Sequence, residues 1–481
     1  MAPEPRMNPP TEAPPNGQKE KMVIGSACVA VFMATLDTSI VNVSLPEISR
    51  SFHMDTVGAV GIIQYYQLFL AATMLVCGKV ADQFRLKSLF IGGFGLFTLS
   101  SILCAAAPTA AWLVVGRSIQ GIGGSLLTIT SYTLVPKHVP RENRGKSYGW
   151  ITTSAAFGLT IGAPLGGFLT GSLSWPWIFW INIPIGLAAM FFAGTCLPSE
   201  PGQRGSLRSS ARLDLWGAAL SFLSVWFFLY AIGPGRKNGF FSLSVFFTLL
   251  AAGTLFVWFV LRLKKVPHPI VDPQLLRVAP FILSVTSAVS AFLFLAGSNF
   301  LYPFFLELVK KLSPAQSGLT LTVYSVVYMC ISPLAGRLAD TIGPVRTCRI
   351  GMSSASLACL FFVLTVPQAG IWPVFVFLAW LAASFGFFIA PNNHLLLSQA
   401  QEGNQGSAAG LYGLLTRLGM LMGVGVMEAL FSSIAGRQSD VLPALSAAPP
   451  AVLHGFQAVG IGGILLCAFS AFLMFRIPAS T

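Results

Sequence analysis

The sequence predicts an all-α integral membrane protein with 14 transmembrane helices, built as two pseudo-symmetric six-helix bundles plus two inserted helices. Three observations lead to this fold class. Of the 481 residues, 54% are hydrophobic and 9% are charged, whereas soluble domains carry about 25% charged residues. The apolar residues form continuous runs near the roughly 20 residues that a helix needs to cross the hydrocarbon layer. A short motif also recurs in the two halves of the chain.

The chain begins with a polar tail and continues with the spans. Residues 1–21 hold six prolines and no apolar run, which predicts a disordered cytoplasmic tail. We expect no cleavable signal peptide, because the first apolar run continues from near Met22 past Leu45 with an aspartate inside it. The predicted spans, with ends good to a few residues, are 22–45, 58–78, 88–107, 111–134, 147–171, 177–197, 213–233, 242–262, 280–304, 318–335, 347–366, 372–394, 407–430 and 456–476.

An internal repeat divides these spans into two halves. The sequence G-K-V-A-D at Gly78–Asp82 follows the second span, and G-R-L-A-D at Gly336–Asp340 follows the tenth. If the seventh and eighth spans are an inserted pair, each half has six spans and the two motifs occupy the same position. The predicted domains are therefore a bundle at 22–212, two linking helices at 213–263 and a second bundle at 264–481. Parallel halves related by an axis along the membrane normal are a transporter architecture.

Lysines and arginines predict the orientation. With the N-terminus inside, 21 of the 29 Lys and Arg residues fall in inner segments, six fall in outer loops and two, Arg117 and Arg417, lie inside spans. The positive-inside rule then predicts a multi-pass protein of the inner (plasma) membrane with both termini in the cytoplasm. The net charge of +13 comes without a basic patch, so we expect no nucleic-acid partner.

Several kinds of chemistry find no support in the sequence. The eight cysteines form no C-x-x-C pair and the five histidines have no metal-ligand spacing, so we expect neither a metal nor a cofactor. There is no P-loop and no G-x-S-x-G motif, which argues against ATP use and hydrolase chemistry. We therefore expect that the protein is not an enzyme, and that any uphill work draws on an ion gradient.

Three charged side chains lie clearly inside spans: Asp37, Arg117 and Arg417. A charge at the bilayer centre costs roughly 2.5–3.5 kcal/mol on insertion scales, which suggests that these residues have a function. At about 1.5 Å of rise per residue, Asp37 and Arg117 reach nearly the same depth in the outer half of the membrane. We predict that Asp37 is a protonatable group and that Arg117 is the cation that tunes its proton affinity. A purely structural ion pair, or an aspartate that caps a local helix break, is the alternative.

Other polar side chains in spans are candidates for a substrate cavity. Gln64 and Tyr66 put an amide and a phenol on the second span, and Gln120 and Arg417 are further candidates. The carboxylates of Glu307 and Glu428 fall near the predicted outer interface, where a charge costs little.

Four more segments carry patterns that occur in a fixed order. They are L-D-T-S-I-V-N-V-S-L-P at 36–46, R-S-I-Q-G-I-G at 117–123, G-L-T-I-G-A-P-L-G-G at 158–167 and W-I-F-W-I-N-I-P-I-G at 177–186. With the repeated motif, this order resembles the major facilitator superfamily, specifically its fourteen-helix drug:proton antiporter family. The resemblance covers nearly the whole chain after the tail. The chain departs from the family pattern at Arg85, where the loop motif usually has a second glycine, and at Ala163, where the fifth-helix motif usually has its proline.

The resemblance implies roles for two sets of residues. Gly158, Gly162, Pro164, Gly166 and Gly167 would form the antiporter motif of the fifth helix, which is expected to limit proton leak. Plain helix packing through a small-x-x-x-small face is the alternative for these glycines.

The second set is a cytoplasmic gate formed by Gly78, Asp82, Gly336 and Asp340. The resemblance implies that Asp82 latches helix ends at the cytoplasmic face, with Arg144 or Arg141 as its partner. Asp340 would be the pseudo-symmetric copy of this aspartate in the second half.

The features together predict a proton-coupled secondary transporter that exports amphipathic or lipophilic small molecules by alternating access, as a multidrug efflux antiporter. An exporter of one specific metabolite or lipid-like compound is the alternative, and a non-transporting membrane sensor is a more remote one. We expect a monomer whose partners are its small-molecule substrate, protons and the lipid bilayer.

Overall fold

A computed structural model of the chain describes residues 17–54, 56–198, 214–238, 242–267, 269–366, 370–401, 403–435 and 449–478. Most of the predicted tail and most of the basic segment before the seventh span lie outside these residues. Every regular element in the described part of the chain is helical.

The N-terminal bundle contains the first six predicted spans. Its helices are α1 (Gly17–Ser51), α2 (Thr56–Gln83), α3 (Leu86–Ala105), α4 (Ala110–His138), α5 (Arg144–Ser172), α6 (Trp177–Trp180) and α7 (Asn182–Cys196). The short α6 and α7 together form the sixth span. Helix α1 begins five residues before the predicted start of the first span, so residues 17–21 are helical rather than part of a disordered tail.

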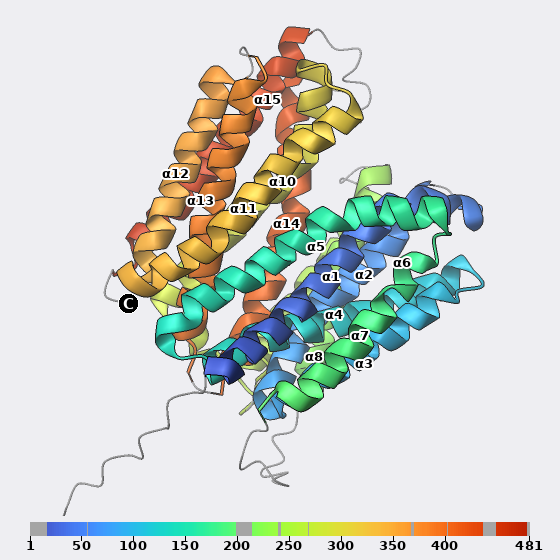
Figure 1. Cartoon of the computed structure of the whole chain (residues 1–481), viewed down its shortest axis with the longest axis vertical. Helices are drawn as coiled ribbons and strands as arrows, with labels where there is room; N and C mark the ends of the chain where they lie inside the picture. The colour runs from blue at the N-terminus through green and yellow to red at the C-terminus, as the bar shows by residue number, and fades with distance from the viewer. Residues whose placement is uncertain are drawn as a thin grey trace, which may run out of the picture.

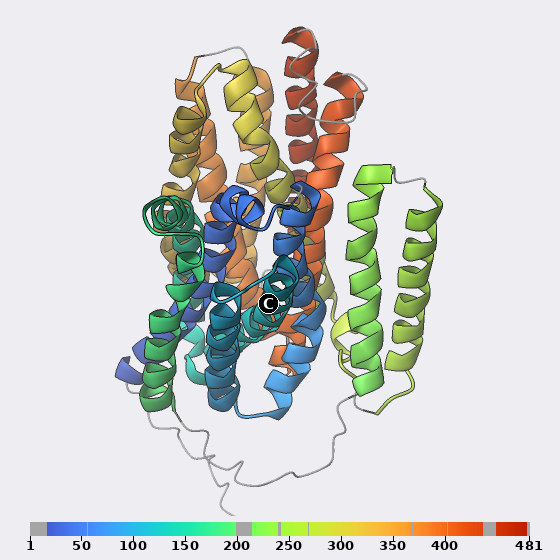
Figure 2. The ribbon, with the colours of Figure 1, turned by 90° about the vertical axis from the view of Figure 1, so that its right-hand side faces the viewer.

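Two inserted helices follow, α8 (Leu215–Asn238) and α9 (Leu243–Leu263). They stand together beside the two bundles (Figure 2), and aromatic side chains attach α8 to α2, with the rings of Phe69 and Trp226 5.3 Å apart. Asp214 accepts a hydrogen bond from the Gly217 amide (2.9 Å) at the start of α8 and pairs with Arg262 of α9 (2.7 Å). This buried carboxylate therefore joins the two inserted helices.

The C-terminal bundle contains the last six spans. Its helices are α10 (Ala279–Phe304), which continues as a π-helical turn η3 (Phe305–Val309), α11 (Pro314–Ile342), α12 (Pro344–Thr365), α13 (Trp372–Ser398), α14 (Gln405–Ala435) and α15 (Pro449–Phe475). With α6 and α7 counted as one span, each of the 14 predicted spans corresponds to a helix, which confirms the predicted fold class. Eleven helices in the described part are long and apolar enough to cross a membrane.

Local sequence signals set several helix ends. A capping box starts α11, because the Ser313 hydroxyl accepts from the Gln316 amide (3.3 Å) while the Gln316 side chain accepts from the Ser313 amide (3.0 Å). Gly343 ends α11 with φ of 93°, a left-handed conformation that favours glycine. The equivalent Arg85 has φ of −64°, so the first copy of this turn does not need the family's glycine.

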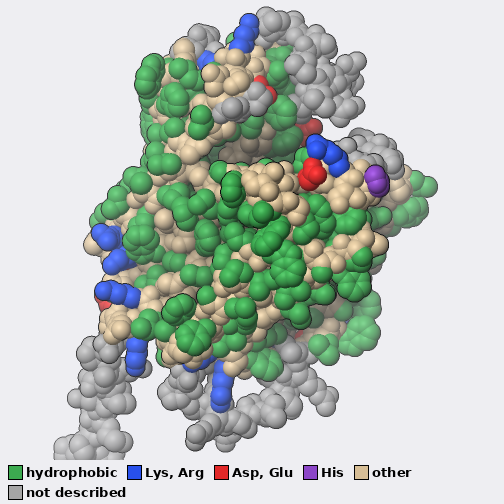
Figure 3. All heavy atoms as spheres, turned by 45° about the vertical axis from the view of Figure 1, so that its right-hand side comes forward, with side chains coloured by type: hydrophobic (Ala, Val, Ile, Leu, Met, Phe, Trp, Pro, Cys, Tyr) green, Lys and Arg blue, Asp and Glu red, His purple; other side chains and the backbone are tan. Residues whose placement is uncertain are grey.

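The surface of the molecule is apolar between its two ends. Large side chains such as those of Trp216, Phe191 and Leu465 are 70%, 67% and 66% exposed. Hydrophobic side chains cover the middle of the face in Figure 3, while lysines and arginines gather toward its ends. Such a surface suits a lipid solvent, in which helices satisfy their own backbone hydrogen bonds. The protein is therefore a multi-pass membrane protein.

The two bundles meet at one end, which we call the joined end. There α2 packs on α14 and α5 packs on α11 (Figure 1). Glycines allow this approach: a Cβ on Gly406 would lie 2.8 Å from Asp82 Oδ1, and one on Gly145 would lie 2.6 Å from Asp340 Oδ1. The bundles diverge toward the opposite end (Figure 1), and a hollow separates them on the face shown in Figure 3.

Candidate functional site

The structure brings Asp37 of α1 and Arg117 of α4 into a buried ion pair. Arg117 Nη1 lies 2.5 Å from Asp37 Oδ2, and the two side chains are 1% and 0% exposed. The sequence predicts that Asp37 and Arg117 lie at nearly the same depth, and in the structure the two side chains are in direct contact. Breaking a buried pair of this kind is costly, because the remaining charge has neither water nor a counterion.

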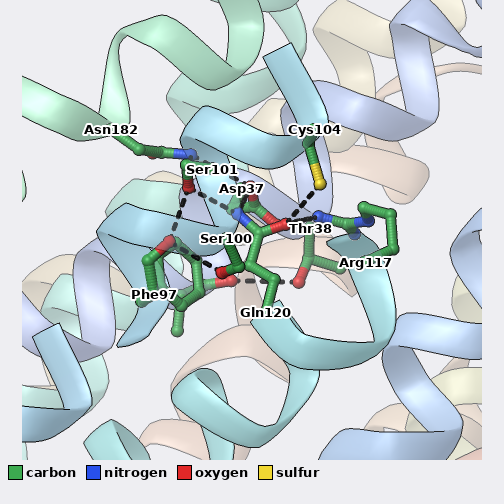
Figure 4. Close-up of polar contacts among 10 residues, drawn as sticks. Asp37, Thr38, Phe97, Ser100, Ser101, Cys104, Arg117, Gln120 and Asn182 are labelled. Atoms are coloured by element: carbon green, nitrogen blue, oxygen red, sulfur yellow. Dashed lines mark hydrogen bonds and ion pairs between the residues drawn. The ribbon is translucent and has the colours of Figure 1, made fainter. Parts of the chain in front are cut away.

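Two amide side chains complete the surroundings of the Asp37 carboxylate (Figure 4). Asp37 Oδ1 accepts hydrogen bonds from Gln120 Nε2 (2.9 Å) and from Asn182 Nδ2 (3.1 Å). Gln120 also accepts from Arg117 Nη1 (2.6 Å) and donates to Ser101 Oγ (2.8 Å). Every group that contacts the carboxylate is thus a hydrogen-bond donor.

The Arg117 guanidinium is held from another side by aromatic rings. Its Cζ lies 4.1 Å from the centre of the Tyr66 ring and 5.8 Å from that of Phe179. Such contacts stabilise a cation whose desolvation is otherwise unfavourable. Arg117 Nε has no hydrogen-bond partner in the described part of the chain, so one donor of this buried cation remains unsatisfied.

The four residues predicted for a substrate cavity occupy different environments. Tyr66 and Gln120 are fully buried and belong to the surroundings of the ion pair. Gln64 is exposed on α2, and Arg417 on α14 is partly exposed. Tyr66 and Gln120 therefore adjoin the ion pair, whereas Gln64 lies at the surface of α2. Glu307 in η3 and Glu428 on α14 are also partly exposed.

The glycines of the fifth-helix motif lie against the part of α1 that carries Asp37. A Cβ on Gly162 would lie 3.0 Å from the Leu36 carbonyl, and one on Gly166 would lie 2.8 Å from the Ile40 carbonyl. Ser39 also donates a hydrogen bond to the Leu159 carbonyl (2.7 Å). These contacts make α1 and α5 one tightly packed unit.

The remaining residues of that motif are divided between the contact with α1 and the surface. Gly158 also packs on α1, where a Cβ would lie 3.0 Å from the Leu36 amide. Pro164 and Gly167 are exposed, and a Cβ on Gly167 would meet only Val43, at 4.0 Å.

At the joined end, Asp82 binds the N-terminus of a helix from the other bundle. Its carboxylate accepts hydrogen bonds from the Gly406 amide (2.6 Å), the Ser407 amide (2.8 Å) and the Ser407 hydroxyl (2.6 Å) at the start of α14. The expectation that Arg144 or Arg141 would be the partner of Asp82 is wrong. The amides at a helix start converge and carry partial positive charge, which suits a carboxylate. Arg144 instead donates to the Pro136 carbonyl (2.6 Å).

Asp340 of the C-terminal bundle makes the same kind of contact with a helix of the N-terminal bundle. Its carboxylate accepts from the Gly145 amide (2.7 Å) and the Lys146 amide (2.9 Å) at the start of α5, and His394 Nδ1 lies 3.7 Å away. Each bundle thus supplies one aspartate that caps a helix of the other bundle. The repeated motif predicts this symmetry, although it does not predict the partners.

Asp82→Asn is expected to shift the protein toward conformations in which the joined end opens. Loss of a charged cap is worth about 1 kcal/mol, or roughly a fivefold change in a two-state ratio. Spin labels at exposed Glu142 and Thr341, on opposite bundles, would measure the separation. Asp340→Asn should cause a similar shift, and thermal stability should change little in both variants. An unchanged distance distribution with normal transport would contradict this interpretation.

The chain is similar to a known protein family and to several known transporters. The model described as Major Facilitator Superfamily matches residues 27–424. The uncharacterized transporter YebQ of Escherichia coli K12 is 28% identical, over 86% of this chain and 89% of its own length. The riboflavin transporter RibZ of Clostridioides difficile 630 is 28% identical, over 84% and 87%. The multidrug resistance protein Stp of Mycobacterium tuberculosis is also 28% identical, over 84% and 74%.

Solved structures share the fold at lower sequence identity. The human organic anion transporter MFSD10 aligns with a TM-score of 0.65 and 16% identity, over 96% of this chain and 100% of its own. The proton:xylose symporter XylE aligns with a TM-score of 0.64 and 16% identity, over 96% and 97%. At this identity, the likeness concerns the fold alone.

Proposed function

This chain belongs to the major facilitator superfamily of secondary transporters, and we propose that it is a proton-coupled antiporter that exports amphipathic small molecules. The observation that carries the proposal is the fully buried pair of Asp37 and Arg117, enclosed by amide donors. A carboxylate at this depth is costly to insert. A role in binding and releasing a proton during transport would explain why this carboxylate lies there beside a cation.

The proposed cycle starts from the conformation with the joined end closed. The basic inner loops support a cytoplasmic joined end by the positive-inside rule, and the cavity between the diverging bundles would then open to the outside. A proton that enters from there would neutralise Asp37 and weaken its pair with Arg117. Asn182 Oδ1 has no hydrogen-bond partner in the described residues, and rotation of this amide would offer an acceptor to the protonated acid. Release of the aspartate caps at the joined end would then open the inner side.

The names of several relatives support export of drug-like compounds, since Stp and others carry the name multidrug resistance protein. The relative named as a riboflavin transporter supports the alternative, which is transport of one specific compound.

We propose that the protein acts in the inner membrane as a monomer with both termini in the cytoplasm. Reconstitution in proteoliposomes with an imposed pH gradient tests the proposal: compound-dependent proton flux supports it, and its absence across a panel of amphipathic compounds contradicts it.

Gln120→Leu is expected to move the pH midpoint of proton-driven transport upward. Gln120 donates to the Asp37 carboxylate, and loss of a donor to the charged form favours protonation. Transport rates measured across a pH series would report the shift. Gln401→Leu, at an exposed loop glutamine, is the matched control, and a midpoint equal to that of the control would contradict a role for Gln120.

A further inference from the structure

Arg417 is a partly exposed cation on α14, on the side of the C-terminal bundle that faces the other bundle, and no acidic side chain of the described residues pairs with it. It lies twelve residues after Gln405, the first residue of α14, which places it about 18 Å along the helix from the joined end. No hydrogen bond or ion pair connects its side chain to any described residue. The buried carboxylate of Asp37 is already paired with Arg117. The charge of Arg417 is therefore uncompensated within the described part of the protein.

Two tyrosines of the N-terminal bundle are electrostatic neighbours of Arg417. They are Tyr66 on α2 and Tyr132 on α4, and α14 packs against both of these helices. The Tyr132 ring stacks on that of Tyr148, with 6.1 Å between their centres. Because these tyrosines belong to the N-terminal bundle and α14 to the other, Arg417 lies where the two bundles face each other.

The side-chain amide of Asn392 is a further polar group near these tyrosines. Tyr412 of α14 packs against the cores of both bundles and is close to Tyr132 and to Asn392 of α13. Asn392 is fully buried, and neither its amide nitrogen nor its oxygen has a hydrogen-bond partner among the described residues. Buried polar groups are satisfied in the great majority of cases, so this amide, whose neighbour is the Tyr412 phenol, keeps hydrogen-bonding capacity for a group that enters between the bundles.

We propose that Arg417 binds the anionic group of an aromatic substrate whose ring packs on Tyr132 and Tyr412, with Asn392 as a hydrogen-bonding group for a polar substituent. The exported compounds are then organic anions. This inference rests on the proposed function and names its substrate class. A planar guanidinium suits a carboxylate or sulfonate, which it binds with paired hydrogen bonds.

Anion export would also change the energetics of the exchange. A proton that moves inward and an anion that moves outward both transfer positive charge inward. The membrane potential would therefore assist both movements, and transport of an anion should be more voltage-dependent than transport of a neutral compound.

Three probes with the same ring test the charge preference: 2-naphthoate, 2-naphthamide and 2-naphthylmethylammonium. Binding to the purified full chain in nanodiscs is measured by isothermal titration calorimetry. We expect naphthoate to bind most tightly to the wild type. Arg417→Gln should weaken naphthoate binding at least about tenfold and leave naphthamide binding nearly unchanged, which also shows that the variant is folded. Arg417→Lys should keep part of the preference.

Arg346→Gln is the matched control, because it removes an exposed arginine from α12. It should bind all three probes as the wild type does. The proposal is overturned if the ammonium probe binds as well as naphthoate, if Arg417→Gln weakens all probes alike, or if naphthoate does not bind up to millimolar concentration.

Transport measurements separate this inference from the proposed function. Arg417-dependent naphthoate binding without proton-coupled transport in proteoliposomes would overturn the antiporter and retain the anion site. Proton-driven transport of the ammonium probe that is unaffected by Arg417→Gln would retain the antiporter and overturn the anion site.

Discussion

Asp37→Asn is expected to leave the protein inserted and folded but unable to accumulate substrate against a gradient. The amide has nearly the same shape as the carboxylate, and its oxygen can still accept the hydrogen bonds of Gln120 and Asn182. Its NH₂ group then faces Arg117, which loses its counterion, so the variant should be less stable than the wild type although still folded. It cannot bind and release a proton at physiological pH, so the link between proton flow and substrate flow is lost. Because coupling depends on this exchange in every cycle, we expect loss of uphill transport rather than a partial decrease.

Proteoliposomes with an imposed pH gradient measure this loss directly. Glu47→Gln is the matched control, since it removes an exposed carboxylate from the same helix, one that pairs with Arg50 at 2.9 Å on the surface. Surface pairs contribute only about 0–1 kcal/mol, so this variant should transport at the wild-type rate. Accumulation by Asp37→Asn at the rate of the control would show that another group carries the proton.

The sequence was sufficient to predict the helices and the central ion pair. Long apolar runs are strong local signals, and a charge inside such a run stands out by its cost. Helix rise then placed Asp37 and Arg117 at one depth, which the 2.5 Å contact between them matches. These inferences need only the distance along a helix, which sequence position gives directly.

Contacts between bundles could not be predicted in the same way. Asp82 and its partner Gly406 are 324 residues apart in the chain, and nothing in the local sequence indicates which helix start would receive the carboxylate. The sequence places Tyr66 on the second span, but it does not show that its ring packs on the guanidinium of Arg117 rather than lining a cavity. Asn182 could have been predicted as a site residue from the sequence, because it is an amide in an otherwise apolar segment of the sixth span.

Arg117→Ala is expected to abolish coupling and to make the stability of the protein depend strongly on pH. The Asp37 carboxylate would remain fully buried without its counterion, and breaking a buried pair in this way costs about 3–5 kcal/mol. The folded variant escapes this cost by keeping Asp37 neutral, whereas the unfolded chain ionises above about pH 4. Stability should therefore fall as the pH rises from about 4 toward 8. Thermal unfolding measured across this range, beside the wild type, reports the effect.

The double variant Asp37→Asn/Arg117→Ala distinguishes a coupling role from a purely structural one. It contains no buried carboxylate, so its stability should no longer fall with rising pH, but it should still fail to accumulate substrate. Arg117→Lys keeps a cation and should retain part of the pH-dependent transport, although a single ammonium cannot reproduce both the contact with Asp37 and the hydrogen bond to Gln120. If the pair were only structural, the double variant would regain transport together with stability. If Arg117→Ala transported with the pH dependence of the wild type, the cation would have no part in proton exchange.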